Sequence, residues 1–220
     1  MESRRSDDAI HRVTFNEPHL HGVIILRNFF SHDECQQIID ESEDWGESVA
    51  QVYKEPGKTN PKSHISEDLR KGHIRHYDYN TKGPTWFHDI LKQAAVRYTE
   101  SFPDGPAYDL ENPKLSVEVA CYTDRGDHFE THQDMYIRSE HLSDKHKASQ
   151  TRKLSMSCIL SEEFHGGRLS MVGSHGVSNP MPLFKGDICL FPSYQLHKVS
   201  RLEGGERYSL ICWVLGDFWR

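Results

Sequence analysis

The second half of the chain is dominated by short apolar runs that alternate with turn residues. Between residues 115 and 215 these runs are LSVEVACY, KLSMSCIL, GRLSMV, GDICLF and RYSLICWVL. Runs of this length, rich in β-branched and aromatic residues and bounded by glycine, proline or polar residues, are typical of β-strands. Several such strands close together predict a sandwich or a jelly roll. We therefore expect an all-β half at about residues 114–218.

The first half carries two helical patterns. Ser31 and Glu34 have the spacing of a capping box, and the apolar run that follows predicts a helix from about residue 32 to 44. Apolar residues at helical spacing over residues 85–98 predict a second helix. A short apolar run at residues 22–26 predicts a strand.

The segment between these elements, residues 53–83, is polar and rich in lysine, proline, glycine and histidine. It predicts a long loop with a short strand near Ile74. Loops of this length can close over a binding site, and a merely solvated surface segment is the alternative.

Composition limits the classes of protein that need to be considered. A length of 220 residues suits one domain, which we expect at residues 13–220 after a flexible tail at 1–12. The net charge of -7 does not favour nucleic-acid binding. No apolar run approaches a membrane span and the N-terminus lacks the apolar core of a signal peptide, so the expected location is the cytoplasm, with no membrane partner. Without CxxC spacing, we expect the cysteines to be buried and reduced; they are Cys35, Cys121, Cys158, Cys189 and Cys212.

The stretch THQDMY places His132 and Asp134 two residues apart. In a strand these side chains share one face and Gln133 points to the other, so the pair offers two ligands for a divalent metal. Alone, the pair is a weak signal. His197, which follows an expected strand and a Pro–Ser turn, is the candidate third ligand. Two histidines and one carboxylate with open positions form the facial triad of non-haem Fe(II) oxygenases.

Ten residues after His197, Arg207 opens the run RYSLICWVL and shares a strand face with Ser209. A guanidinium and a hydroxyl suit the far carboxylate of a dicarboxylate cosubstrate. A buried arginine is costly without a partner, and this run contains no acidic residue. A surface arginine in a salt bridge is the alternative.

Three longer stretches together resemble a known family. They are CYTDRGDHFETHQD, LSMSCILSEEFHGGRLSM and GDICLFPSYQLHKVSRLEGGERYSLICW. Over about residues 115–215 they are similar to the prolyl-4-hydroxylase-like branch of the Fe(II)/2-oxoglutarate dioxygenases, and GVIILRNFFSHDECQQII looks like the strand and helix that open such domains. The resemblance implies an α+β fold: a double-stranded β-helix (jelly-roll) core with N-terminal helices packed on one sheet.

The resemblance also implies roles for matching residues. The triad would hold Fe(II), and Arg207 with Ser209 would bind the distal carboxylate of 2-oxoglutarate. Tyr122 would lie against this cosubstrate. Trp213 would lie near the pocket on the face of Arg207, with a core tryptophan as the alternative. Gly166-Gly167 is interpreted as a turn and close-packing signal.

One position departs from the family pattern. Family members often carry a second tyrosine where this chain has Ile159, and that tyrosine contacts the cosubstrate. Ser155 and Ser157 share the face of Ile159 by alternation. One of these serines, or Ser209, is the candidate replacement.

The implied activity is hydroxylation of an unactivated C–H bond with dioxygen, releasing succinate and carbon dioxide, with ascorbate as a candidate reductant. Asp134 favours hydroxylation because related halogenases carry a small residue there. The resemblance suggests a prolyl residue of a protein or peptide as substrate, with a free amino acid or other small molecule as the alternative. A non-catalytic jelly-roll binding module is a rival hypothesis. Another jelly-roll metalloenzyme is a weaker one, because such enzymes gather more histidines; the nearby spare, His128, is expected at the surface.

Overall fold

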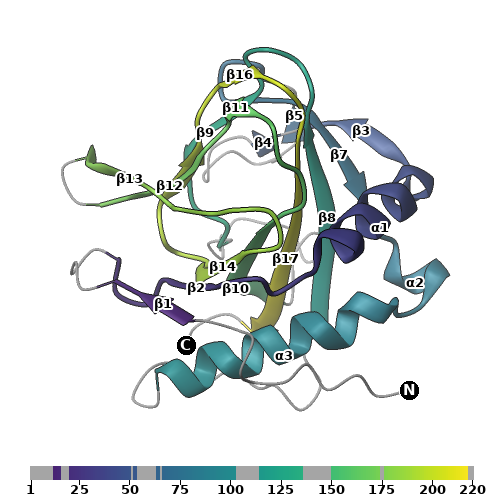
Figure 1. The fold of residues 1–220 in the computed structure, drawn as a ribbon, viewed down its shortest axis with the longest axis vertical. Helices are drawn as coiled ribbons and strands as arrows, with labels where there is room; N and C mark the ends of the chain where they lie inside the picture. The colour runs from purple at the N-terminus through teal and green to yellow at the C-terminus, as the bar shows by residue number, and fades with distance from the viewer. Residues whose placement is uncertain are drawn as a thin grey trace, which may run out of the picture.

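The computed structural model describes residues 12–15, 20–50, 52–53, 63–64, 66–102, 114–135, 150–173 and 176–217. Two antiparallel sheets form its centre (Figure 1). The larger sheet has eight strands in the order β1 (Arg12–Thr14), β2 (Ile24–Leu26), β14 (Ile188–Pro192), β10 (Gln150–Ile159), β17 (Arg207–Asp217), β8 (Lys114–Tyr122), β7 (His73–His76) and β3 (Glu47–Val49).

The smaller sheet has five strands in the order β13 (Ser178–Pro180), β12 (Leu169–Val172), β15 (His197–Val199), β9 (His128–His132) and β6 (Arg70–Lys71). Two short ribbons pair β11 (His165–Gly166) with β16 (Leu202–Gly204), and β4 (Val52–Tyr53) with β5 (Ser63–His64). The chain passes repeatedly between the two large sheets, as in a double-stranded β-helix, so the predicted jelly-roll fold is confirmed.

The helices are α1 (His32–Ser42), the 3-10 turn η3 (Glu43–Trp45), α2 (Tyr79–Lys82) and α3 (Trp86–Ser101). The predicted capping box of α1 is confirmed: the Glu34 amide donates to Ser31 Oγ at 3.2 Å, and the Ser31 amide donates to the Glu34 carboxylate at 2.7 Å. The α-helix ends at Ser42, two residues before the predicted end, and continues as η3.

The main core lies between the helices and the outer face of the larger sheet. Ile38 of α1 and Leu91 of α3 pack in one buried cluster with alternate residues of the central strands, such as Met156 and Leu210. Figure 1 shows α1 and α3 beside this sheet. Each fully buried aliphatic side chain of this kind contributes about 1.5–3 kcal/mol of burial free energy. The predicted packing of the helices on one sheet is confirmed.

The inner face of the larger sheet turns toward the smaller sheet and divides into regions. At one end Ile25 and Phe191 pack on Leu169 and Met171 of β12. At the other end Tyr122 packs in a smaller apolar cluster with Ala120 and Leu202. Between them, the inward positions of β10 and β17 carry buried polar residues: Ser155, Ser157, Arg207 and Ser209. A polar strip inside a β-sandwich indicates a site, because unpaired polar groups are costly there.

The prediction of a long loop at residues 53–83 is wrong for residues 70–82, except for the expected strand near Ile74. β6 extends the smaller sheet, β7 extends the larger one, and α2 follows. Strand β7 pairs with β8 and β3, and its Ile74 is buried, so the strand expected near Ile74 is confirmed. The mostly polar composition hid β6, an edge strand that pairs with β9. The prediction that this segment closes over a binding site stays a prediction, and most of residues 53–65 lie outside the described residues.

Three further expectations concern the cysteines, the N-terminal tail and membrane-spanning segments. All five cysteines are free and buried, as predicted. Residues 1–11 of the expected tail lie outside the described residues, while Arg12 begins β1. None of the helices in the described ranges is long and apolar enough to cross a membrane.

Candidate metal centre

The candidate centre is built on a cross-strand pair. β9 ends at His132 and β15 begins at His197, and the two residues are direct partners in the antiparallel register. Opposite residues of an antiparallel pair hold their Cβ atoms only about 4.5–5.5 Å apart. The two imidazole rings accordingly lie with their centroids 4.1 Å apart.

Asp134 reaches the same place by a different route from the one predicted. It lies beyond the end of β9, so strand alternation alone does not orient it. Instead, the amides of Asp134 and Met135 donate to the Ser193 carbonyl at 2.9 and 3.0 Å. Asp134 Oδ1 is then 3.7 Å from His132 Nε2, and Oδ2 is 3.5 Å from His197 Nε2. The three candidate ligand atoms all lie within 4.8 Å of one another, so these residues could hold a metal ion.

Both imidazoles are oriented by their own backbone. His132 Nδ1 lies 2.8 Å from the Glu130 carbonyl oxygen, and His197 Nδ1 lies 2.8 Å from that of Gln195. A carbonyl can only accept, so each Nδ1 carries the proton and donates it. The Nε2 lone pairs are left to face Asp134, which is the arrangement that metal-binding histidines usually show.

The protonation states suit metal binding. Burial, with His197 beside it, lowers the pKa of His132 to about 3, so its imidazole is neutral. Burial alone would raise the pKa of Asp134, but His197, His132 and the Arg152 guanidinium lower it to about 2. A neutral imidazole and an ionised carboxylate are the forms that bind metals.

A row of unpartnered donors lies on β17 next to this cluster. Within the described residues, Arg207 Nε and Nη2 and Ser209 Oγ are buried and have no hydrogen-bond partner. Trp213 Nε1 is also buried and makes no hydrogen bond of good geometry there, although its side chain lies close enough to Asp134 to interact with the carboxylate. They share the inward face of the strand, as predicted. Trp213 is the direct partner of Ser155 on β10 and lies close enough to Asp134 to help lower its pKa. Buried polar atoms are rarely left unpaired, so this row indicates a place for an oxygen-bearing ligand.

Of the side chains in this row, Arg207 has the highest free-energy cost of burial, because it is charged. Its side chain is only 1% exposed, and burial lowers its pKa to about 10, which still leaves it charged at neutral pH. The ring of Tyr122, its direct partner on β8, lies 5.4 Å from the guanidinium carbon. Within the described residues no carboxylate pairs with Arg207. An anionic ligand would satisfy its charge.

Glycine makes room for Arg207. Gly167 has a φ of +55°, and a Cβ built on it would lie 2.8 Å from Arg207 Cδ. Real Cβ atoms do not approach other atoms so closely, so only glycine fits here without a shift. The structural interpretation of Gly167 is thus extended: it packs directly against the candidate ligand-binding arginine.

Sequence reasoning missed several residues of the site. The guanidinium carbon of Arg152 lies 3.4 Å from the centroid of the Trp213 ring, and Arg152 Nη1 lies 3.8 Å from Asp134 Oδ1. Ser155, considered only as a cosubstrate contact, donates to Asp134 Oδ2 at 2.7 Å. The expectation of a surface His128 is wrong: this residue is 1% exposed, and its ring bonds the Gly126 carbonyl at 2.8 Å. These roles depend on strand register, which the sequence does not show.

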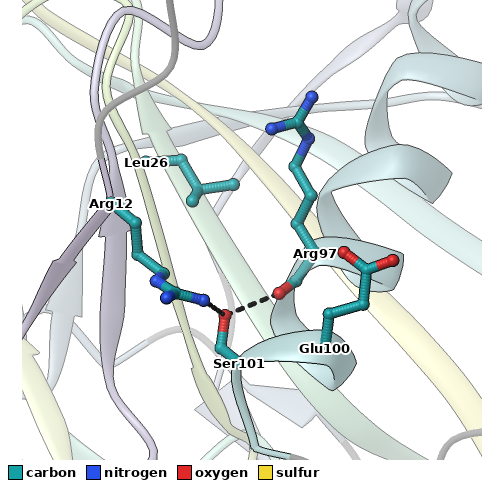
Figure 2. A pocket seen from close by; sticks show the side chains of 5 residues that line it. All are labelled: Arg12, Leu26, Arg97, Glu100 and Ser101. Carbon is teal, nitrogen blue, oxygen red and sulfur yellow. Dashed lines mark hydrogen bonds between the residues drawn. The ribbon is translucent and has the colours of Figure 1, made fainter. Parts of the chain in front are cut away.

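A surface hollow elsewhere in the molecule is unrelated to this centre. Figure 2 shows it between β1 and the end of α3, lined by Arg12, Leu26, Arg97, Glu100 and Ser101. Arg12 donates to Ser101 Oγ at 2.8 Å, and Ser101 donates to the Arg97 carbonyl at 2.6 Å. None of the candidate metal ligands lines it.

Residues 117–215 match the model of the 2OG-Fe(II) oxygenase superfamily. This part of the chain is therefore similar to the 2OG-Fe(II) oxygenase superfamily. The matched residues include the candidate triad and Arg207, and they begin in β8 and end in β17. The resemblance to a prolyl-4-hydroxylase-like oxygenase is confirmed.

A curated protein is similar to the same part of the chain. The chain is 32% identical over 106 residues to a PKHD-type hydroxylase of Synechococcus, a match that covers 46% of the chain and 44% of that relative. The match therefore spans less than half the length of that curated relative.

Two solved structures show the same fold. A prolyl-4-hydroxylase of Pseudomonas putida has a TM-score of 0.57 and 20% identity, covering 88% of this chain and 91% of that chain. SnoN, an alpha ketoglutarate dependent epimerase from nogalamycin biosynthesis, also has a TM-score of 0.57, at 13% identity, covering 89% and 78%.

The superfamily implies Fe(II), 2-oxoglutarate and dioxygen. The residues present fit these groups. The triad offers two nitrogens and a carboxylate with room for further ligands, the donor set of non-haem Fe(II) oxygenases. The unpartnered Arg207 and Ser209 offer a cation and a hydroxyl to a carboxylate.

Proposed function

We propose that this chain is an Fe(II)- and 2-oxoglutarate-dependent dioxygenase that hydroxylates an unactivated C–H bond. His132, Asp134 and His197 would hold the metal, and Arg207 with Ser209 would bind the distal carboxylate of 2-oxoglutarate. The observation that carries the proposal is the meeting of three metal-ligand atoms with a row of buried, unpartnered donors on β17. A non-catalytic binding module does not account for the second half of that observation.

Activation of dioxygen at the expense of 2-oxoglutarate, which leaves as succinate and carbon dioxide, is the chemistry that bound Fe(II) would supply. The protein's own residues would bind the metal and the cosubstrate and orient them. Each Nδ1 keeps its proton and donates it to a backbone carbonyl, so both Nε2 atoms remain available as ligands. Arg207 would fix the cosubstrate at one end, with Tyr122 against it.

The buried surroundings have a second role. Asp134 is 8% exposed, His197 is 4% exposed, and Ser209 is fully buried. Water is therefore largely excluded from the polar strip, and charge interactions within it are stronger than at the surface. Trp213, whose ring borders Asp134, would form part of the wall near the metal.

For the substrate, we propose a prolyl residue of a protein or peptide. The support is the name of the prolyl-4-hydroxylase of matching fold and of the PKHD-type hydroxylase relative. A free amino acid or another small molecule is the second candidate, since an epimerase from nogalamycin biosynthesis is equally similar in fold. We propose that residues 13–220 act as one domain and that ascorbate serves as reductant.

The test of the proposed activity is succinate formation from 2-oxoglutarate with Fe(II), dioxygen and ascorbate. The wild type should form succinate even without substrate, at a slow uncoupled rate, and His197→Ala and Asp134→Ala should not. Lys114→Ala, an exposed position at the start of β8, is a matched control that should behave as wild type. Succinate formation that persists in His197→Ala would refute the site assignment.

The substrate class needs a separate measurement. Candidate proline-containing peptides and a small-molecule extract would each be incubated with wild type and Asp134→Ala. Mass spectrometry should show a gain of one oxygen in the peptide pool with wild type only. A gain confined to the small-molecule pool would favour the second candidate.

A further inference from the structure

Asp134 is held by a pair of hydroxyl groups that the proposed reaction does not otherwise use. Ser155 Oγ donates to Asp134 Oδ2 at 2.7 Å, and Ser155 Oγ lies 2.9 Å from Ser193 Oγ. All three side chains are buried, with exposures of 8%, 1% and 1% for Asp134, Ser155 and Ser193. Oxygens that meet at such distances away from solvent form real hydrogen bonds.

The direction of these bonds follows from proton counting. An ionised carboxylate can only accept, so Ser155 must give its single hydroxyl proton to Asp134. Ser155 can then only accept from Ser193, which must be the donor of the second bond. The order is fixed as Ser193 to Ser155 to Asp134.

The backbone around Ser193 explains why two serines meet here. The Ser193 amide donates to the Lys153 carbonyl of β10 at 3.0 Å, and the Ser193 carbonyl accepts from the amides of Asp134 and Met135. One short turn after β14 is thus bonded both to β10 and to the segment that carries Asp134. Asp134 has no strand partner of its own because β9 ends at His132.

We propose that Ser155 and Ser193 are positioning residues that fix the Asp134 carboxylate as a metal ligand. This inference rests on the proposed function, because it assumes that Asp134 binds the metal. With Ser155 bound to Oδ2, the carboxylate presents Oδ1 toward His132 and Oδ2 toward His197. Without the hydroxyl, the buried carboxylate would lose the 2.7 Å hydrogen bond from Ser155, and it could rotate or draw in water.

The assignment separates two roles on neighbouring strands. Ser155 was a candidate to replace the missing cosubstrate tyrosine at Ile159, but its proton is committed to Asp134. Ser209 lies across from Ile159 in the register of β10 and β17, and its hydroxyl has no partner. The metal side therefore depends on Ser155 and the cosubstrate side on Ser209.

The test is the affinity of the protein for Co(II), used in place of oxidisable Fe(II) and followed by its visible absorption. Loss of a group that orients a metal ligand typically costs roughly 10–100-fold in metal affinity, which is the fall expected for Ser155→Ala. Ser155→Cys keeps the side-chain volume but donates only a weak hydrogen bond, so its Co(II) affinity should fall as that of Ser155→Ala does. Ser155→Thr keeps the hydroxyl and should recover most of the wild-type affinity.

Ser193→Ala should have a smaller effect, because its hydroxyl reaches Asp134 only through Ser155. The Ser155→Ala/Ser193→Ala double variant should be no weaker than Ser155→Ala alone, since the two groups act as one unit. Ser170→Ala is the matched control: Ser170 is also a buried serine, 3% exposed, and it lies on β12 opposite Lys198 of β15 and Pro180 of β13. It should bind Co(II) as the wild type does.

The outcomes separate this inference from the proposed function. If wild type binds no Co(II), the metal site itself is refuted. If the wild type binds Co(II) and Ser155→Ala binds it equally well, the positioning role is refuted and the metal site stands. The same conclusion follows if Ser155→Thr binds Co(II) more weakly than Ser155→Ala does. If Ser155→Ala does not fold, Ser155→Thr and Ser193→Ala decide: an unchanged affinity in Ser193→Ala overturns the inference.

Discussion

His132 and His197 face each other across antiparallel strands β9 and β15, with their ring centroids 4.1 Å apart and each Nδ1 bonded to a carbonyl two residues earlier. Sixty-five residues of sequence separation become a direct contact through register alone. Both rings are already oriented for metal binding, because neither needs to turn to present its Nε2 atom. The first prediction follows from this geometry.

Replacing His197 with glutamine should lower metal affinity by more than the roughly 10–100-fold that loss of an orienting group costs, because a ligand is removed outright. The check is a metal titration monitored by calorimetry. His165→Gln, at an exposed position on β11, is the control and should bind as wild type. Equal affinity in His197→Gln would remove His197 from the site.

Replacing Arg207 with methionine should affect stability and function in opposite directions. The ligand-free protein loses a buried charge with two unpartnered nitrogens, so it should gain about 1–3 kcal/mol in free energy of unfolding. Affinity for 2-oxoglutarate should fall by roughly 10–150-fold, the equivalent of about 1.5–3 kcal/mol for a charged hydrogen bond. Urea unfolding without ligand and the KM for 2-oxoglutarate measure the two effects.

Arg168→Met, at an exposed position, is the control for this substitution and should change neither quantity. A less stable Arg207→Met protein in the absence of ligand would show that Arg207 already has a partner within the protein.

Replacing Gly167 with alanine should displace Arg207. A Cβ at this position would lie 2.8 Å from Arg207 Cδ and 3.3 Å from Leu202 Cδ1, at a φ of +55°. Gly126→Ala is a matched control, because Gly126 also has a positive φ, +93°, but nothing lies within 4 Å of its Cβ. Both variants should lose about 1–2 kcal/mol of stability from backbone strain.

Only Gly167→Ala should also raise the KM for 2-oxoglutarate. Parallel KM and urea measurements on the two alanine variants make the comparison. A KM that rises equally in both would mean that strain, and not the contact with Arg207, is responsible.

His88 makes the stability of α3 depend on pH. The Thr85 amide donates to His88 Nδ1 at 3.0 Å, which requires a neutral ring, and burial lowers the pKa of His88 below its ordinary value. In the unfolded chain His88 takes up a proton at its ordinary pKa of ~6.5, whereas in the folded chain it does so only at a lower pH. The contribution of neutral His88 to the free energy of unfolding is therefore fully present above pH ~6.5. It is lost as the pH falls from that value toward the folded pKa. Stability should therefore decline on acidification.

His88→Gln keeps an acceptor for the capping box but does not titrate, so it should flatten the decline. Urea unfolding of wild type and variant at pH ~7.5 and ~5.5, on either side of the ordinary histidine pKa, is the measurement. An identical pH dependence in the two proteins would exclude His88 as its source.

The fold could be predicted from sequence where the local signal and the global structure agree. Strands β8, β10, β12, β14 and β17 have apolar runs bounded by turns, and Ser31 and Glu34 mark the start of α1. Strand β6 was missed because it is short, polar and held by pairing with β9, which no local pattern reveals. Edge strands of this kind carry polar residues because one side faces solvent.

The site likewise has residues that the sequence predicts and contacts that it does not reveal. The spacing of His132, Asp134, His197 and Arg207 was enough to group them, because their chemistry is specific and alternation places Arg207 and Ser209 on one face. The reason Asp134 joins the histidines was not visible: it depends on the Ser193 carbonyl and on the hydroxyl of Ser155. Contacts between distant turns are set by packing, and a single sequence does not record them.

The most direct test of the central claim is metal-dependent binding of 2-oxoglutarate without oxygen, measured by calorimetry with and without Fe(II). The triad and the donor row on β17 should act as one site. Wild type should therefore bind 2-oxoglutarate tightly only when Fe(II) is present. Arg207→Met should keep the metal but lose most of the affinity for 2-oxoglutarate. Tight binding of 2-oxoglutarate without the metal, or undiminished binding in Arg207→Met, would contradict the account.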